Sequence, residues 1–279
     1  MIHICSSTLQ TLDKNAPIGI FDSGVGGLTV AQAVKKLLPG EDMIYFGDSA
    51  HLPYGDKSAA TIQAYSIKIT DILLGRGCKV ILIACNSASA AAYDLIKAYV
   101  GSKAHVINVI DPVIEHLKQG EAKQKVGLIG TLQTVNSKVF ESKIKNEGID
   151  VEFSALATPL LVPMIEEGFI HNSVSHEIIA NYLSDPILSR VDSLILGCTH
   201  YPIIKEDIKE FYKSKVELVD SANIVARSLK QQLKALNLLS DKTEGNDQFL
   251  VSDYTPAFEK AARLFFNKEI HLEKYPLWE

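Results

Sequence analysis

The sequence lacks several features that would assign a class of function directly. Its 279 residues contain four cysteines, with no C-x-x-C pair and no metal-ligand spacing, so we expect neither a disulfide framework nor a metal site. It has no Lys/Arg cluster and a net charge of -5, which argues against nucleic acid. No apolar run is long enough to span a bilayer, and no signal-peptide pattern is found. We therefore expect a cytoplasmic protein without a membrane partner.

Nucleotide-binding glycine motifs are also missing. The turn DSGVGG (22–27) carries G-x-G at Gly24 and Gly26, but Thr29 stands three positions later where a dinucleotide site needs glycine. These glycines favour close approach of the backbone to a small anion at a helix N-terminus. Asp22 is then either the N-cap of the following helix or a functional acid.

Two stretches that resemble each other dominate the rest of the chain. In VILIACNSASA (80–90) and SLILGCTHYP (193–202), an apolar run ends at a thiol, Cys85 or Cys198. The residues after the thiols are polar: Asn86 and Ser87 in one stretch, Thr199 and His200 in the other. This pattern is typical of a buried parallel strand entering a βα turn, the edge of the sheet where ligands bind. We interpret the other cysteines, Cys5 and Cys78, as a tail residue and a packing residue.

Landmarks in the two halves of the chain recur at a similar spacing. Three pairs of positions are 108, 107 and 113 residues apart: Ser23 and Thr131, Phe46 and Phe153, and Cys85 and Cys198. This spacing indicates an internal duplication, and therefore an α/β protein whose mostly parallel sheets are flanked by helices. Besides the two cysteine strands and a strand in KVGLIGT, we expect strands at 17–21, 42–46, 105–110, 216–220 and 248–252. We expect helices at 28–38, 58–74, 88–100, 223–236 and from Pro202 to about Tyr212.

One thiol in each of two matched halves favours racemisation. If the strand ends meet in one cleft, a base stands on one side of a substrate carbon and an acid on the other, as removal and return of a proton require. Each thiol must be activated, because at a pKa of about 8.5 only a few per cent is thiolate at pH 7. A helix N-terminus, His200 or Asp22 could contribute.

Two other classes of function remain open on the residues alone. A Cys-His hydrolase would need one thiol, an orienting acid and an oxyanion hole, and would leave the other thiol without a role. A protein that binds an amino acid or anion without turning it over would share the turns but has no need for paired thiols.

Five motifs together resemble the glutamate racemases, cofactor-independent members of the aspartate/glutamate racemase superfamily. They are IGIFDSGVGGLTV, YFGDSAHLPYGDKS, ACNSASA, VPMIEEG and LGCTHYP, found in order from Pro17 to Pro202. The resemblance implies interconversion of L- and D-glutamate by two cysteines, supplying D-glutamate for peptidoglycan, with no pyridoxal phosphate. A relative acting on aspartate or another acidic substrate is the enzymatic alternative.

The resemblance also assigns roles to individual residues. It implies that Cys85 and Cys198 exchange the proton and that Asp22, His200 and Glu166 assist them. The implied substrate-binding pairs are Asp22 and Ser23, Tyr54 and Gly55, Asn86 and Ser87, and Thr199 and His200. The implied fold has two pseudo-symmetric domains with the active site between them: residues 1–109 with 220–279, and residues 110–219.

Some positions differ from the usual family pattern. Ser87 replaces a commoner threonine, Asp111-Pro112 replaces Glu-Pro, and VSDYTPAF lacks a usual glycine. We expect these changes to affect local packing or oligomer geometry more than activity. Family members are commonly dimers, so a homodimer is expected. The leader before Pro17 resembles that of members activated by UDP-N-acetylmuramoyl-L-alanine, which makes this nucleotide a possible partner.

Overall fold

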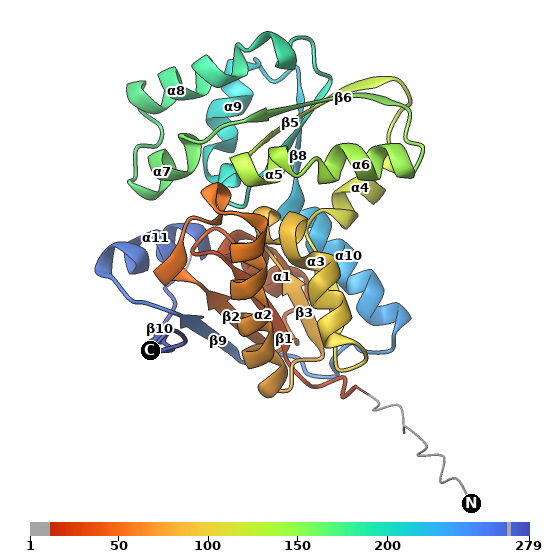
Figure 1. Ribbon diagram of the computed structural model, residues 1–279, viewed down its shortest axis with the longest axis vertical. Coiled ribbons are helices and arrows are strands. Elements are labelled where there is room, and N and C mark those ends of the chain that lie inside the picture. Colours follow the sequence, from red (N-terminus) through yellow and green to blue (C-terminus); the bar gives the residue numbers. More distant parts are fainter. Residues whose placement is uncertain (1–11, 267–268) are drawn as a thin grey trace, which may run out of the picture.

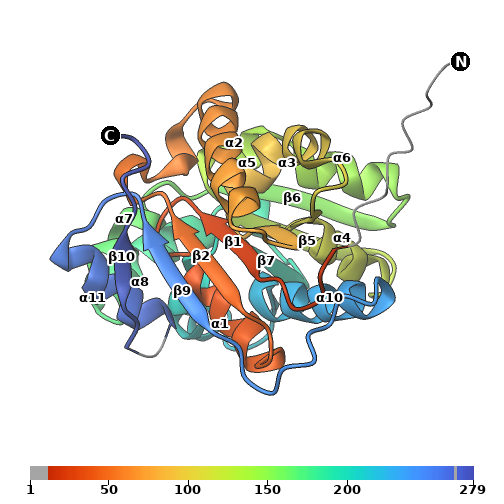
Figure 2. The same ribbon diagram turned by 90° about the horizontal axis from the view of Figure 1, so that it is seen from below.

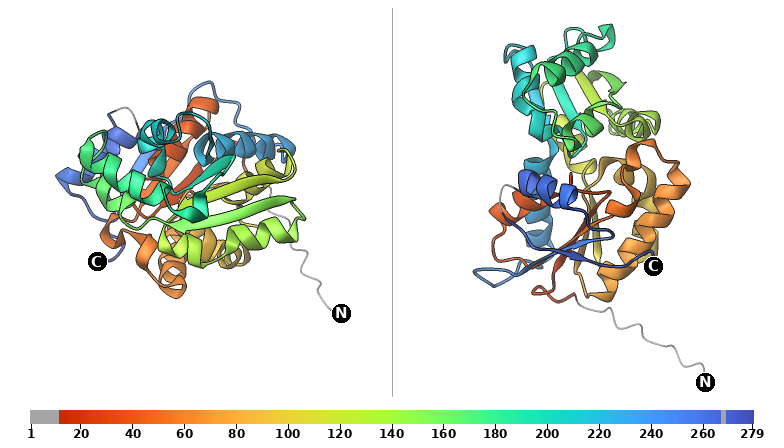
Figure 3. Two further views of the ribbon diagram at one scale, coloured as in Figure 1. Left: turned by 90° about the horizontal axis from the view of Figure 1, so that it is seen from above. Right: turned by 90° about the vertical axis from the view of Figure 1, so that its left-hand side faces the viewer.

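The computed structural model describes residues 12–266 and 269–279, so Cys5 and most of the leader lie outside the described residues. The described chain forms two lobes, one above the other in Figure 1 and in the side view of Figure 3. Each lobe is built on one sheet, and every strand pair in both sheets is parallel. The expected α/β class with parallel sheets is confirmed.

The first sheet has the strand order β10-β9-β2-β1-β3-β4. Its strands are β1 (Ile18–Asp22), β2 (Met43–Gly47), β3 (Val80–Ile83), β4 (His105–Asn108), β9 (Asp247–Val251) and β10 (Leu272–Lys274). The second sheet has the order β6-β5-β7-β8. Its strands are β5 (Gln124–Gly130), β6 (Val151–Ala157), β7 (Ser193–Gly197) and β8 (Glu217–Asp220). The order β2-β1-β3-β4 is therefore repeated as β6-β5-β7-β8, as a duplication predicts.

Helices cover both faces of the first sheet. Seen from below, α2 and α3 lie on one face, and α1 and α10 on the other (Figure 2). The helices of this lobe are α1 (Leu28–Leu37), α2 (Ala59–Gly75), α3 (Asn86–Val100), α10 (Ser221–Ala235) and α11 (Pro256–Phe266). Alternate residues of β3 enter separate cores: Val80 packs with the α1 side and Ile81 with the α2 side. The sheet is therefore buried on both faces, which explains the continuous apolar runs in its sequence.

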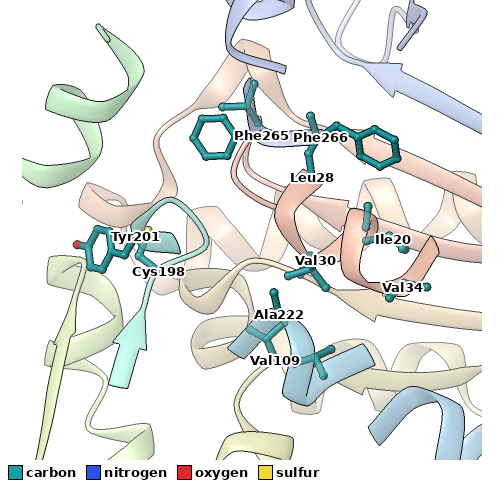
Figure 4. Packing of buried hydrophobic residues seen from close by; sticks show 14 of the residues in the cluster. Ile20, Leu28, Val30, Val34, Val109, Cys198, Tyr201, Ala222, Phe265 and Phe266 are labelled. Carbon is teal, nitrogen blue, oxygen red and sulfur yellow. The ribbon is translucent and has the colours of Figure 1, made fainter. Parts of the chain in front are cut away.

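The second sheet is also flanked by helices, as the view from above shows (Figure 3). They are α4 (Asp111–Lys118), α5 (Leu132–Asn136), α6 (Val139–Asn146), α7 (Leu161–Glu166), α8 (Ser173–Leu183) and α9 (Lys205–Phe211). The largest buried cluster continues from one lobe to the other, joining Val30 of α1 to Cys198 and Tyr201 after β7 (Figure 4). This continuity fixes the carboxyl ends of β1, β3 and β7 relative to one another.

A buried ion pair ties the first sheet to distant segments. Lys79, just before β3, is 1% exposed, and its Nζ lies 2.5 Å from Glu41 Oε2. The same Nζ donates to the carbonyls of Leu238, at 2.8 Å, and of Lys14. Glu41 Oε1 accepts from the Ser240 N–H at 2.8 Å. Each charge is thus paired and hydrogen-bonded, the condition under which a buried charge is tolerated.

Several elements differ from the sequence-based expectations. Pro202 does not open an α-helix: it lies in a 3-10 turn, η4 (Tyr201–Ile204), and α9 begins only at Lys205. The expected helix 88–100 begins two residues earlier, at Asn86. The expected elements did not include helices α4, α5, α6, α7, α8 and α11 or strands β6 and β10. The division into residues 1–109 with 220–279, and 110–219, stays a prediction. Among the described residues, no helix is long and apolar enough to cross a membrane.

Candidate active site

Cys85 lies at the junction of β3 and α3. It is the N-cap of α3, and its Sγ accepts from the Ala88 N–H at 3.5 Å and lies 3.8 Å from Ser23 Oγ. A helix N-terminus favours a thiolate, as expected for one of the two thiols. Burial and the nearby Asp22 carboxylate nevertheless raise the pKa of Cys85 to about 12. Cys85 is therefore held as a neutral thiol at neutral pH.

Cys198 lies at the end of β7 in different surroundings. The 3-10 turn η4 follows it instead of an α-helix. Its Sγ lies 3.6 Å from Nδ1 of His200, and His200 Nε2 lies 2.8 Å from Glu166 Oε1. Burial disfavours the imidazolium, but Cys198 and Glu166 together outweigh it and raise the pKa of His200 to about 10. His200 is therefore a cation at neutral pH, next to the sulfur that a thiolate would occupy.

Asp22 ends β1 and is fully buried. It is not a helix N-cap, because Gly27 has that position in α1. Its carboxylate instead accepts from the Gly24 N–H at 3.1 Å and from Thr199 Oγ1 at 3.4 Å. Burial raises the pKa of Asp22, and the positive charge of His200 opposes that rise. Asp22 therefore interacts with groups from the second lobe.

Contacts between the lobes are reciprocal at the strand ends. Thr199, next to Cys198, bonds to Asp22 at the end of β1. Ser87, two residues after Cys85, lies 2.9 Å from the Oγ1 of Thr131 at the end of β5. Thr29 Oγ1 adds a third contact by donating to the Thr199 carbonyl at 3.1 Å. The residues after each thiol thus bond to the opposite lobe, so both strand ends border one site.

The predicted pair Tyr54 and Gly55 lies in the turn η2 (Tyr54–Asp56). The Tyr54 hydroxyl donates to Asp48 Oδ2 at 2.7 Å. A Cβ atom added at Gly55 would lie 2.7 Å from Cβ of Thr131, so only glycine allows this approach to the second lobe. A cavity of about 210 Å³ lies beside this contact and is lined by both lobes. Asn86 Nδ2 is buried and has no hydrogen-bond partner among the described residues, which leaves it free to donate to a ligand.

Some residues at the site were not among the predicted ones. A Cβ atom at Gly26 would lie 2.3 Å from Thr199 Oγ1 and 2.5 Å from His200 Nδ1. The sequence predicted that an anion would approach the backbone of this glycine-rich turn. In the structure, side chains of the second lobe approach it instead. Thr131 was signalled by its match to Ser23. Phe265 of α11, whose ring is 5.1 Å from that of His200, had no signal (Figure 4).

Comparison with known proteins identifies the family. The family described as Asp/Glu/Hydantoin racemase matches residues 28–229 of the chain. The chain belongs to this racemase family. The matched residues include both thiols, Glu166 and His200, and begin six residues after Asp22.

Individual relatives of this racemase cover almost its whole length. It is 41% identical to a glutamate racemase of Geobacter metallireducens over 254 residues, which is 91% of this chain and 93% of the relative. The crystal structure of the Francisella tularensis glutamate racemase in complex with D-glutamate matches with a TM-score of 0.88 and 36% identity, covering 95% of this chain and 99% of that one. The Escherichia coli glutamate racemase, in complex with L-glutamate and the activator UDP-MurNAc-ala, matches with a TM-score of 0.74 and 26% identity over 93% and 98% of the two chains.

These findings identify the chain as an amino-acid racemase. A thiol hydrolase would use the same spatial arrangement of Cys198, His200 and Glu166. This geometry alone therefore does not distinguish a hydrolase from a racemase. The family membership distinguishes them, in favour of the racemase.

Asp111 is one of the positions that depart from the usual family pattern. It stands at the start of α4 and pairs with Lys143 of α6 at 2.7 Å.

Proposed function

We propose that this racemase interconverts L- and D-glutamate, using Cys85 and Cys198 as the acid and base. The observation that carries the proposal is that the two thiols, at matched strand ends, lie in opposite electrostatic surroundings. Cys85 has a raised pKa and lies beside a carboxylate, whereas Cys198 lies beside an imidazolium. A racemase must present one thiolate and one thiol to opposite faces of the same carbon, and the imidazolium beside one sulfur and the carboxylate beside the other differ in charge as such a pair would need.

The proposed reaction moves one proton onto and one proton off Cα. Cys198, as a thiolate paired with His200, removes the Cα proton and becomes a thiol, leaving the electron pair on Cα. Cys85 then delivers its own proton to the opposite face and becomes the thiolate. Glu166 orients and charges His200, and the negative charge of Asp22 keeps Cys85 protonated until transfer. The reverse reaction exchanges the roles of the two thiols.

Polar groups around the thiols would hold the substrate. We propose that Ser23, Asn86, Ser87, Thr199 and the Tyr54-Gly55 turn bind its carboxylates and ammonium. The unpartnered Nδ2 of Asn86 supports this assignment, since a buried donor without a partner is costly unless a ligand satisfies it. The choice of glutamate is supported by the Geobacter relative and by the D-glutamate bound to the Francisella enzyme.

The test is incubation with L-glutamate in D2O without added cofactor, following optical rotation and deuterium at Cα. We expect D-glutamate carrying deuterium from the native chain and none from Cys85→Ser or Cys198→Ser. Cys78→Ser is the matched control, because Cys78 is also a buried thiol but lies in the α2 core. If deuterium enters Cα of aspartate but not of glutamate, the substrate assignment is wrong. If deuterium enters neither amino acid, a binding protein without turnover becomes the better interpretation.

We also propose that a peptidoglycan precursor activates the enzyme. The Escherichia coli relative was crystallised with the activator UDP-MurNAc-ala, and the leader before Pro17 resembles that of activated members. Initial rates with and without the nucleotide test this directly. Activation should raise kcat or lower KM in a saturable manner, and unchanged rates across the titration would remove the proposal.

The remaining expectations concern the cell and the assembly. We propose that the D-glutamate product serves peptidoglycan synthesis in the cytoplasm and that the enzyme is a homodimer. Expression in a bacterial strain that requires D-glutamate should restore growth without the supplement, and Cys85→Ser should not. Light scattering of the purified chain should give twice the mass of 30.6 kDa.

A further inference from the structure

A buried carboxylate outside the proposed chemistry collects hydrogen bonds from three separate parts of the chain. Asp48, just after β2, is fully buried. Its Oδ2 accepts from the Tyr54 hydroxyl at 2.7 Å. Its Oδ1 accepts from Ser252 Oγ at 2.7 Å and from the indole Nε1 of Trp278 at 2.8 Å. His51 Nδ1 lies 3.2 Å from both oxygens. The orientation of Asp48 therefore depends on residues more than 200 positions away in the sequence.

Trp278 is held in place for this bond by aromatic and cationic neighbours. The ring of His51 meets the indole edge-on, with centroids 4.5 Å apart, and stacks on Tyr65 at 4.2 Å. Lys68 Nζ lies 4.4 Å from the indole centroid. Figures 2 and 3 show this end of the chain beside the loop between β2 and α2. The indole is thus fixed against α2 with its N–H directed at Asp48.

The other end of this arrangement reaches the proposed substrate site. Tyr54 precedes Gly55, which packs against Thr131 of the second lobe too closely for any side chain. Burial and the charge of Asp48 raise the pKa of Tyr54 far above its ordinary value, so the phenol stays protonated and donates to Asp48. A rotation of Asp48 would move the Tyr54 hydroxyl and shift Gly55 relative to Thr131.

We propose that Trp278 is a positioning residue for substrate binding, acting through Asp48 on the Tyr54-Gly55 turn. The inference rests on the proposed function, because it takes this turn to be part of the glutamate site. This positioning role differs from a purely structural role for the Trp278 indole. A packing residue would change the free energy of unfolding, whereas a positioning residue changes the affinity for substrate at temperatures where the protein is fully folded.

The test compares three variants of the full chain. Trp278→Phe removes the N–H donor but keeps an aromatic ring, and Ser252→Ala removes the other donor to Asp48 Oδ1. Tyr275→Phe is the matched control: it also changes an aromatic residue to phenylalanine, in the same segment, and Tyr275 contacts Phe46 and Arg76 instead of Asp48. We expect KM for glutamate to rise about tenfold in the first two variants, the effect of losing one hydrogen bond to a charged group. We expect kcat to stay within about twofold, and the control to keep the native KM.

A second measurement separates this inference from the proposed function. Hydrogen exchange of residues 48–56 without substrate should be faster in Trp278→Phe and Ser252→Ala than in the native chain. Native KM and native exchange in both variants would overturn the inference, even if glutamate is racemised. So would a loss of kcat at constant KM. If the native chain does not act on glutamate, the proposed function fails, and the exchange rates alone decide whether Trp278 orders the turn.

Discussion

Replacement of Glu166 by glutamine tests the electrostatic argument for the Cys198 side of the site. The change keeps a hydrogen-bonding group 2.8 Å from His200 Nε2 but removes the negative charge. A hydrogen bond to a charged group contributes roughly 1.5–3 kcal/mol. The Glu166 side chain is 21% exposed, so solvent screening favours the lower end of that range. At 1.36 kcal/mol per unit, the pKa of His200 should fall by about one unit from its value of about 10.

The assay is the pH dependence of kcat/KM for glutamate. Activity should decline on the alkaline side as His200 loses its proton, at about pH 10 in the native chain and roughly one unit lower in Glu166→Gln. At neutral pH His200 stays protonated in both proteins, so kcat/KM should change much less there than at about pH 9 to 10. Glu167→Gln is the matched control, because this neighbouring carboxylate is exposed and forms no ion pair with His200. An alkaline limit that is unchanged in Glu166→Gln would refute the reasoning.

Glu166→Gln should also change how the free energy of unfolding depends on pH. The pKa of His200 in the folded chain is raised above its ordinary value of 6.5. Its contribution to stability is therefore fully present below about pH 6.5 and is lost as the pH rises through about 10. Glu166→Gln should lose about 1.4 kcal/mol less than the native chain over that interval, measured as the unfolding free energy in urea. An equal pH dependence in both proteins contradicts the assigned pKa.

Two further substitutions test the contact between the lobes and the buried ion pair. Gly26→Ala places a Cβ atom 2.5 Å from His200 Nδ1, so kcat/KM should fall by at least about 100-fold. Gly24→Ala is the control: the nearest atom to its Cβ lies at 3.4 Å, so kcat/KM should fall far less. Equal losses of kcat/KM in the two variants would contradict the steric argument. Lys79→Met leaves Glu41 buried and unpaired, so the unfolding free energy should fall by about 3–5 kcal/mol in urea, and the double variant with Glu41→Leu should recover most of it.

The sequence predicted the two cysteine strands well because their signals are local. An apolar run that stops at a thiol and continues in small polar residues needs no distant contact to be recognised. The start of α3 was predicted two residues too late. Asn86 and Ser87 are weak helix formers, and the helix includes them because Cys85 caps it. Similarly, η4 interrupts the helix expected after Pro202 through the packing of Tyr201, which is fully buried.

Other features depend on contacts that no local pattern contains. Glu166 and His200 are 34 residues apart and meet only because α7 packs beside η4. Asp48 and Trp278 are 230 residues apart. Strand β10 has three residues, and its identity comes from pairing with β9 rather than from its own composition. The family resemblance supplied Glu166, but it had no counterpart for Trp278, since the motifs that carry it end at Pro202.

The turns after the two thiols differ in structure, and the difference bears on the charge that we propose for His200 beside Cys198. Two residues after Cys85, the neutral Ser87 lies in the first turn of α3; two residues after Cys198 stands His200. The N-terminus of an α-helix carries a partial positive charge, which destabilises a cation in its first turn. An α-helix starting directly after Cys198, as α3 does after Cys85, would therefore oppose the imidazolium. In the 3-10 turn η4, His200 is instead the N-cap and stands before the first turn, and its Nε2 lies 2.8 Å from Glu166 Oε1. The departure from symmetry thus lies where the proposed two-thiol reaction would need an acid on one face of a carbon and a base on the other.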